Sequence, residues 1–390
     1  MIAVIADDFT GAAEIGGIGL RHGLKVVIKT DLVATVECDL LIIASDTRSL
    51  SKEDANSEIK KITSYLISLK PQLIFKKIDS ALRGNIEYEL VAQMEVMKKS
   101  RAIVVAGNPN FNRLIKNGIY YVNDELLSDT YFATDPEFPV KTSSVLEIIK
   151  KGTVAITNCT SNDVLPVSGL IIGDNCSEVD MSRWANHVDH DSIAAGSAVF
   201  FHQLLIKYHY TENITQQNKF IIREKSLFIF GSKFPKSEEL IERINAASIE
   251  IVNMPEALFK SAEVQIAIIK KWGEEIAKSL NNGKKVVVTM IYDSDKLEGL
   301  SKRIKDNIGL LVSNILAKTT IDDLLIEGGA TTFSILNQLK ISELYPVKEI
   351  EPGVILMIPK NNPNLNITTK PGSYMWPNEI WIPNSKFTMR

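Results

Sequence analysis

The sequence has few cysteines and no long hydrophobic run. Its three cysteines, Cys38, Cys159 and Cys176, lie far apart and form no Cys-x-x-Cys pair, which argues against a disulfide framework and against a zinc site built on thiolates. This usage fits a reducing cytoplasm. No apolar segment approaches the roughly 20 residues of a spanning helix, and no basic segment precedes the first apolar residues, so we expect neither membrane insertion nor secretion.

An excess of basic residues and the common nucleotide signatures are also missing. The 44 Lys and Arg against 47 Asp and Glu give a formal net charge of −3, which argues against a general nucleic-acid binder. The glycines at 16, 17, 19 and 23 fall inside a helical stretch and do not form a dinucleotide fingerprint. Residues 231–237 lack the spacing and the Gly-Lys-Ser/Thr ending of a Walker A loop. We therefore disfavour an NAD-linked dehydrogenase and a P-loop NTPase. A hydrolase is disfavoured as well, because the sequence shows no nucleophile paired with a base.

The length and the hydrophobic pattern predict two α/β domains. A chain of 390 residues, 45% of them hydrophobic, exceeds one ordinary core. Short β-branched runs alternate with amphipathic stretches, as in parallel sheets covered by helices. A polar stretch from Tyr210 to Glu224 is typical of an exposed connection. We therefore predict two domains, 1–215 and 225–390, each a mainly parallel sheet flanked by helices.

The same pattern places the individual elements. In the first domain we predict strands at 2–6, 25–29, 40–44, 73–75, 102–106 and 153–157, and helices at 12–21, 52–68 and 86–99. In the second we predict strands at 227–230, 249–252, 285–289 and 324–326, and helices at 237–247, 262–280 and 300–317. Beyond residue 329 the sequence indicates short strands with several prolines.

Charged side chains gather in the loops that follow predicted strands. Ligands of open parallel sheets bind beyond the carboxyl ends of the strands, so these loops are where a site is expected. Asp7 and Asp8 follow the first strand, and two adjacent carboxylates exceed what a helix cap needs. Arg48 follows the third strand, where it is either a grip for a carboxylate or phosphate, or a surface ion-pair partner.

The segment 76–85 is the most densely charged of these loops. Lys76, Asp79 and Arg83 lie within it, and Asn85 ends it. Such a set can hold an acidic group and accept a proton from an alcohol. A solvated charged turn is the structural alternative, and we weigh it lower because three strand ends repeat the pattern.

Other loops are less specific. Residues 107–135 are long and poor in periodicity, which fits either a substrate loop or a structural hairpin. In the second domain, small residues at strand-to-helix turns leave backbone N–H groups available for phosphate oxygens. His187 and His190 lack further ligands nearby in the sequence, so we interpret them as a polar helix end.

Taken in order, these loops resemble the four-carbon acid sugar kinase family, which includes D-threonate, D-erythronate and 3-oxo-tetronate kinases. The matching segments are ADDFTGA, SDTRS, KIDSALRGN, the NPN loop with TYFATDP, GS, EGGATT and KPGS. The resemblance implies an N-terminal domain for a small-molecule acid sugar, a C-terminal domain for ATP, and phosphorylation of a terminal hydroxyl with Mg2+ as the expected ion.

The resemblance also assigns roles. It implies that Asp8 or Asp79 orients the hydroxyl. Asp7 is the best candidate either for a metal contact or for supporting the residues that make such a contact, although no metal ligand set can be read from the sequence. The substrate-binding candidates are Asp7, Arg48, Lys76, Asp79, Arg83 and Asn85. The ATP-binding candidates are Ser232, Gly328, Gly329, Ala330, Thr331, Lys370 and Gly372.

The chain departs from the family pattern at a few positions. Ala81 stands where the family usually has threonine, and Tyr374 and Met375 stand where phenylalanine and glycine are usual. This keeps open a different class, a non-catalytic two-domain protein that binds or senses a sugar acid. The sequence also leaves open a homo-oligomer and the identity of the acid sugar.

Overall fold

The computed structural model describes residues 1–33, 37–135, 137–150, 152, 154–212, 220–231, 244, 247, 249–260, 265–290 and 300–381. The chain separates into two compact units, Met1–Ile214 and Thr215–Arg390. The division lies within the polar stretch that the sequence marks as a connection. Phe220 and Ile222 are nevertheless buried in the hydrophobic core of the second unit, so that unit includes residues ahead of position 225.

The first unit contains an eight-stranded parallel sheet with the order β2-β3-β1-β4-β11-β5-β10-β9. Its strands are β1 Ile2–Ala6, β2 Val26–Lys29, β3 Leu40–Ala44, β4 Ile74–Lys77, β5 Arg101–Val105, β9 Ile156–Cys159, β10 Gly169–Gly173 and β11 Ser192–Gly196. Most of these strands are buried along their whole length, because helices cover the sheet.

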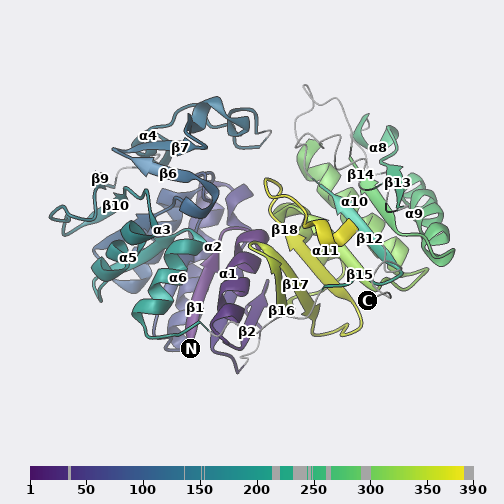
Figure 1. Ribbon diagram of the computed structural model, residues 1–390, viewed down its shortest axis with the longest axis horizontal. Helices are drawn as coiled ribbons and strands as arrows, with labels where there is room; N and C mark the ends of the chain where they lie inside the picture. The colour runs from purple at the N-terminus through teal and green to yellow at the C-terminus, as the bar shows by residue number, and fades with distance from the viewer. Residues whose placement is uncertain are drawn as a thin grey trace, which may run out of the picture. The chain divides into compact units, whose positions relative to one another are not determined.

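The helices of the first unit are α1 Phe9–Arg21, α2 Lys52–Ser68, α3 Ile86–Met97, α4 Val145–Ile149, α5 Glu178–His187 and α6 Ala198–Lys207. Most of them lie beside its parallel sheet, and α4 lies near the small strands β6 Arg113–Lys116 and β7 Ile119–Val122 (Figure 1). Helix α2 packs against α3, and α6 packs against both α1 and α5. Ser51 caps α2 by accepting a hydrogen bond from the N–H of Asp54, and this cap begins the helix where the sequence pattern places it.

A small antiparallel sheet is inserted after β5. Its strands are β6 Arg113–Lys116, β7 Ile119–Val122 and β8 Glu125–Leu126. Asn117 and Gly118 join β6 to β7 with φ of 51° and 72°, the left-handed pair that a tight hairpin turn requires. Residues 107–135 therefore form a hairpin-based insertion, followed by the short turns η3 Leu127–Asp129 and η4 Tyr131–Thr134.

The second unit has a sheet with the order β13-β14-β12-β15-β18-β17-β16. The first five strands are parallel, and β17 and β16 run antiparallel to their neighbours. The elements are β12 Ser226–Phe230, β13 Glu250–Asn253, α8 Ala257–Lys260, α9 Ile266–Asn281, β14 Val286–Thr289, α10 Leu300–Leu316, β15 Asp323–Glu327, α11 Gly329–Gln338, β16 Glu343–Glu351, β17 Val354–Pro359 and β18 Asn366–Lys370.

The predicted fold class is confirmed, because both units contain a mainly parallel sheet flanked by helices. Most predicted elements lie within a few residues of their observed positions. The strand predicted at 153–157 is displaced to Ile156–Cys159. The helix predicted at 237–247 falls largely on residues outside the described part of the chain.

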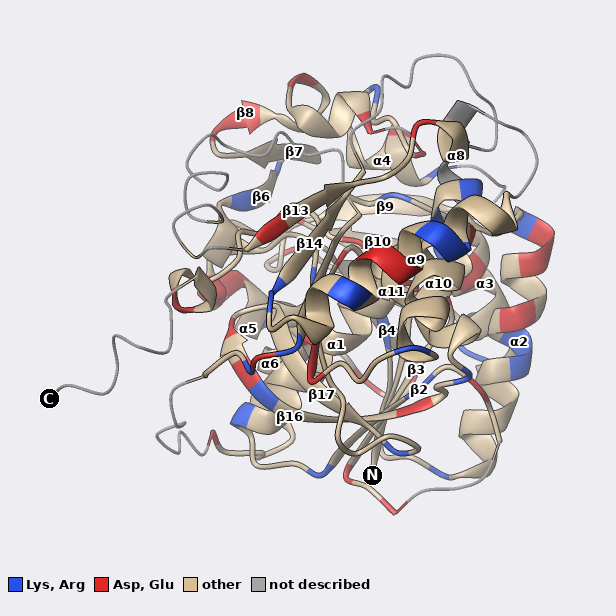
Figure 2. Cartoon of the chain, turned by 90° about the vertical axis from the view of Figure 1, so that its right-hand side faces the viewer, with Lys and Arg blue, Asp and Glu red and all other residues tan. Residues whose placement is uncertain are grey.

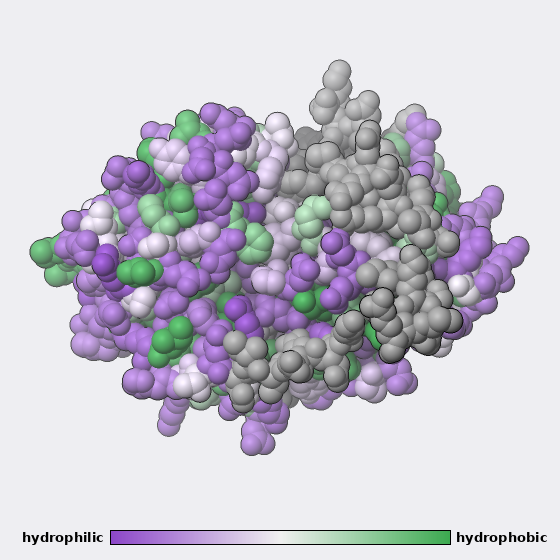
Figure 3. Space-filling model, viewed as in Figure 1, coloured by the Kyte–Doolittle hydropathy of each residue, from purple (hydrophilic) through white to green (hydrophobic). Residues whose placement is uncertain are grey.

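The described surface is polar and carries both signs of charge. Figure 2 shows acidic and basic residues side by side on α2 and α9, in keeping with the nearly balanced composition. On the face drawn in Figure 3, apolar residues lie in small separate groups, as is usual for folded domains. Within the described residues, no helix combines the length and apolarity needed to cross a bilayer.

Candidate functional site

The carboxyl ends of three adjacent strands bring charged side chains together in the first unit. Strand β1 lies between β3 and β4, so the loops that follow these strands meet at one edge of the sheet. Arg48 donates from Nε to Oδ2 of Asp7 at 2.8 Å and from Nη1 to Oδ2 of Asp8 at 3.1 Å. The same Nη1 lies 3.7 Å from Oδ1 of Asp79. Arg48 thus links carboxylates from two other strand ends.

Arg83 forms the second half of this arrangement. Its Nε and Nη2 donate to the two oxygens of Asp79 at 2.7 and 2.8 Å, which is a bidentate pair. Its Nη1 donates to Asp135, from the end of the hairpin insertion, at 2.7 Å. The guanidinium also lies over the ring of Phe132, 5.2 Å from its centroid. We call Asp7, Asp8, Arg48, Asp79 and Arg83 the arginine–carboxylate cluster.

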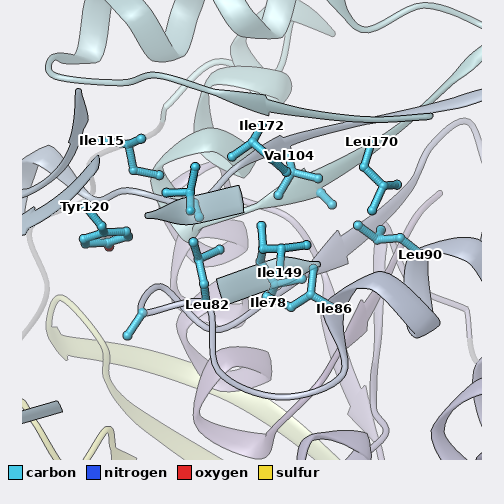
Figure 4. Close-up of a cluster of buried hydrophobic side chains, with 14 of the residues drawn as sticks. Ile78, Leu82, Ile86, Leu90, Val104, Ile115, Tyr120, Ile149, Leu170 and Ile172 are labelled. Carbon is cyan, nitrogen blue, oxygen red and sulfur yellow. The ribbon is translucent and has the colours of Figure 1, made fainter. Parts of the chain in front are cut away.

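The loop that carries Asp79 and Arg83 is anchored by hydrophobic burial. Ile78, Ala81 and Leu82 belong to a core cluster of the first unit, and Figure 4 shows Ile78 and Leu82 among its buried side chains. Ala81 is only 1% exposed, and its N–H donates to Asp79 at 3.2 Å. The family threonine is therefore replaced at a position whose side chain belongs to the core.

Glycine at position 84 lets the loop approach Arg48 closely. Gly84 has φ +97°, and a Cβ placed on it would lie 2.9 Å from Cγ of Arg48. A side chain there would strain the backbone and displace the arginine stem. The glycine of the KIDSALRGN segment is thus required for the packing of the cluster.

The pKa values of the three carboxylates of the cluster are shifted in different directions. Burial opposes ionisation of Asp79, yet Arg83 and Arg48 hold the pKa of that carboxyl far below its usual range. Burial also opposes ionisation of Asp8, but the charges of Arg48 and Lys77 lower the pKa of that carboxyl. Burial raises the pKa of Asp7, and the adjacent Asp8 carboxylate adds to the rise against the attraction of Arg48.

Asp7 also differs in its hydrogen bonding. Asp8 caps α1 by accepting from the N–H of Gly11 at 2.8 Å and from the hydroxyl of Thr10 at 2.8 Å. Asp79 accepts on both oxygens from Arg83. In the described part of the chain, Oδ1 of Asp7 is buried and has no hydrogen-bond partner. Asp7 is therefore the carboxylate of the cluster best able to accept a proton.

Two predicted substrate-binding residues have structural partners. Lys76 is fully buried and its Nζ lies 2.5 Å from Oε2 of Glu89 on α3. The side-chain amide of Asn85 donates to the backbone carbonyls of Thr47 and Leu50 at 3.1 and 2.9 Å. These contacts tie α3 to the sheet and hold the short turn that carries Arg48.

Lys77, the second lysine of the charged loop 76–85, lies at the edge of the cluster although only Lys76 is among the predicted substrate-binding residues. Its Nζ lies 3.4 Å from Oε2 of Glu14 on α1, and its charge lowers the pKa of Asp8. Successive side chains of a strand point to opposite faces, so Lys76 and Lys77 of β4 contact different helices. The alternation of side chains along β4 was the sequence signal that the two lysines have different partners. Asp135 contacts Arg83 only because the hairpin insertion folds back onto the loop.

The second unit gathers the predicted nucleotide turns at neighbouring strand ends. Strand β15 lies between β12 and β18, and the N–H of Gly328 donates to the carbonyl of Lys370 at 3.0 Å. Gly328 has φ +96° and precedes α11, whose N-terminus has no side-chain cap. The N–H groups of Gly329, Ala330 and Thr331 begin this helix. Ser232 lies outside the described residues.

The C-terminal turn has its own packing. Nζ of Lys370 lies 3.0 Å from Oε2 of Glu327, and Lys370 is almost fully buried. Gly372 is half-buried, whereas Met375 is 64% exposed. A Cβ on Gly353 would lie 2.5 Å from the Tyr374 ring, so the aromatic residue packs on the β16–β17 turn.

Comparisons with known proteins agree with this two-part organisation. A sugar-binding N-terminal domain model matches residues 2–196, and a nucleotide-binding C-terminal domain model matches residues 227–374. A D-threonate kinase of Salmonella typhimurium is 33% identical over 149 residues, 37% of this chain and 35% of that protein. This chain belongs to the four-carbon acid sugar kinase family.

Other relatives carry related names. A D-erythronate kinase of Heliobacterium modesticaldum is 32% identical over 154 residues, 38% of this chain and 35% of that protein. A 3-oxo-tetronate kinase of Brucella melitensis is 30% identical over 156 residues, 38% of this chain and 36% of that protein. These alignments span about a third of each relative's length.

The fold is shared along the whole chain. A crystal structure from Salmonella typhimurium LT2 has a TM-score of 0.75 and 17% identity, and covers 97% of both chains. A Haemophilus influenzae protein has a TM-score of 0.68 and 16% identity, and covers 97% of this chain and 98% of that one. At 17% and 16% identity, the likeness to these two structures shows the fold of this chain.

Proposed function

We propose that this chain is an ATP-dependent kinase that phosphorylates the terminal hydroxyl of a four-carbon acid sugar. The observation that carries the proposal is the unpartnered, buried Oδ1 of Asp7 within the arginine–carboxylate cluster. A proton acceptor beside two guanidinium groups suits a substrate that has both a hydroxyl and a carboxylate. The kinase names of the relatives support the same chemistry.

The arginines are proposed to hold the substrate carboxylate. A guanidinium has five N–H donors, and Arg83 uses three of them on Asp79 and Asp135. The remaining donors of Arg83 can bind a planar anion without breaking these pairs. The low pKa of Asp79 keeps that carboxylate ionised, so it fixes the orientation of Arg83.

Asp7 is proposed to accept the hydroxyl proton during transfer. In this step the substrate oxygen bonds to the γ-phosphorus of ATP, the bond from that phosphorus to the β–γ bridging oxygen breaks, and the substrate proton moves to Asp7. ADP is the leaving group. Asp8 and Asp79, the predicted hydroxyl-orienting residues, stay predictions, and their bonding to arginine favours a positioning role for both.

The second unit is proposed to bind the nucleotide phosphates. The first N–H groups of α11, at Gly329, Ala330 and Thr331, suit phosphate oxygens, because the N-cap residue Gly328 has no side chain to accept hydrogen bonds from them. Gly328, with its positive φ, leaves room for close backbone approach, since among the described residues an added Cβ would have only Thr331 Oγ1, at 3.9 Å, within 4 Å. The nucleotide-binding description of the matching domain supports this assignment.

Mg2+ is proposed to arrive with ATP and to neutralise phosphate charge during transfer. Mg2+ in kinase sites is held by phosphates, waters and one or two carboxylates. In the described residues, no group of three carboxylates gathers into a dedicated cage. The metal contact predicted for Asp7 stays a prediction, because its unpartnered Oδ1 is assigned here to the hydroxyl proton.

Product analysis tests the proposal. The purified chain is incubated with Mg-ATP and D-threonate, D-erythronate or 3-oxo-tetronate, and the product is examined by phosphorus NMR. A phosphate monoester coupled to the terminal CH2 protons is expected. An acyl phosphate would move the acceptor to the carboxylate, and failure of every acid to react would favour the non-catalytic binding protein.

A further inference from the structure

Two histidines and a glutamate gather in the first unit, away from the arginine–carboxylate cluster. His22 is the residue that ends α1, His202 lies in α6, and Glu212 lies in the segment that follows α6. Their potential ligand atoms all lie within 4.8 Å of one another. His22 is buried, His202 is partly buried and Glu212 is exposed.

Hydrogen bonding orients His22 as a ligand. Its Nδ1 lies 3.0 Å from the backbone carbonyl of Tyr210, and a carbonyl only accepts, so Nδ1 carries the hydrogen. The lone pair of a neutral His22 is then on Nε2, which lies 3.1 Å from Nδ1 of His202. A ring nitrogen that donates to a backbone carbonyl while the other faces a ligand site is the usual arrangement of metal-binding histidines.

Two of the three distances between the donor atoms are close to those of one face of a zinc tetrahedron. Zinc bound at about 2.0–2.2 Å by nitrogen and oxygen places neighbouring ligands roughly 3.3–3.5 Å apart. The two histidine nitrogens are 3.1 Å apart, and Nδ1 of His202 is 3.7 Å from Oε1 of Glu212. Since Glu212 is exposed, its side chain can turn to complete the face.

We propose that His22, His202 and Glu212 bind a divalent cation of the zinc type, with water as the fourth ligand. Two imidazoles and one carboxylate are a ligand set that zinc uses, whereas Mg2+ prefers oxygen ligands. Arg21, 3.9 Å from Oε1 of Glu212, competes with the ion for this carboxylate.

A bound ion would join three separate parts of the first unit. It would fasten the segment that leaves α6 to the end of α1 and to α6 itself. This role is independent of the proposed kinase reaction, because none of the three ligands belongs to the arginine–carboxylate cluster. The site can therefore be tested without substrate or nucleotide.

Calorimetric titration with zinc chloride tests the site. The full chain is treated with a chelator, dialysed and titrated as the wild type and as His202→Ala, Glu212→Gln and His190→Ala. His190 is the matched control, because its side chain is 87% exposed and outside the site. We expect one zinc per chain in the wild type and in His190→Ala, and binding weaker by about tenfold or more in the other two variants.

Cobalt substitution gives a second measurement. Cobalt in the wild type should give the intense visible absorption of a tetrahedral ion, and Glu212→Gln should reduce it. Unchanged zinc affinity in both ligand variants, or no zinc binding by the wild type at micromolar concentration, would overturn the proposal. If His202→Ala fails to fold by circular dichroism, Glu212→Gln decides alone, because the exposed Glu212 can be changed without altering the core.

Discussion

Replacement of Gly84 by alanine tests how the arginine–carboxylate cluster is assembled. The added Cβ would lie 2.9 Å from Cγ of Arg48, closer than such atoms approach in proteins. The stem of Arg48 must therefore move. Its Nε–Asp7 and Nη1–Asp8 bonds of 2.8 and 3.1 Å would lengthen in consequence.

The free-energy cost of Gly84→Ala has two parts, and a matched variant separates them. A non-glycine residue in left-handed backbone costs roughly 1–2 kcal/mol. Gly283→Ala carries this cost alone, because Gly283 has φ +77° and no described atom lies within 4 Å of the added Cβ. Gly84→Ala adds the loss of a charge-assisted hydrogen bond, about 1.5–3 kcal/mol. If this loss acts on the bound substrate, kcat/KM falls about ten- to a hundredfold.

The assay measures ADP release with the accepted acid sugar, beside urea unfolding of both variants. Gly84→Ala should lose activity and stability, while Gly283→Ala should lose stability and keep wild-type kcat/KM. Wild-type kcat/KM in Gly84→Ala would refute the reasoning, since it would mean that the position of Arg48 does not matter for the reaction.

Three further predictions concern single charges of the cluster. Asp7→Asn should lower kcat by about 10²–10⁴-fold and remove the acidic limb of the pH–rate profile. Because burial raises the pKa of Asp7, this limb should lie above about pH 4 in the wild type. An unchanged pH–rate profile in the variant would exclude Asp7 as the base. Asp79→Asn should destabilise the fold at pH 7 by about 3 kcal/mol in urea unfolding. Because the folded pKa of Asp79 lies below its unfolded value, its ionisation stabilises the fold above about pH 4, and the difference between variant and wild type should shrink as the pH falls further; a pH-independent difference would contradict this. Arg83→Ala should weaken use of the acid sugar about ten- to a hundredfold without changing ATP affinity, and equal loss of both in calorimetry would mark Arg83 as structural.

The sequence could predict which loops form the cluster but not how its side chains pair. Asp7, Arg48 and Asp79 each follow a predicted strand, and parallel strands bring their ends to one edge. Which carboxylate each arginine binds depends on the strand order β3-β1-β4, which local patterns do not contain. For this reason the sequence could suggest that Asp8 or Asp79 orients the substrate hydroxyl, but it could not show that both carboxylates are hydrogen-bonded to arginine.

Long-range pairs were beyond sequence reasoning altogether. His22 and His202 are separated by 180 positions, and they meet because α1 and α6 pack together. Similarly, Lys76 lies in a charged loop of the sequence, yet its side chain is buried and forms an ion pair with Glu89 on α3. Ion pairs buried in this way depend on helix packing, and no spacing rule shows them.

We propose that this chain transfers phosphate from ATP to a four-carbon acid sugar. ADP release from Mg-ATP, measured with a panel of such acids and without acceptor, tests it most directly. We expect release above the acceptor-free rate for at least one acid, and loss of that release in Asp7→Asn. If Mg-ATP binds in calorimetry but no acid raises ADP release, the claim is contradicted.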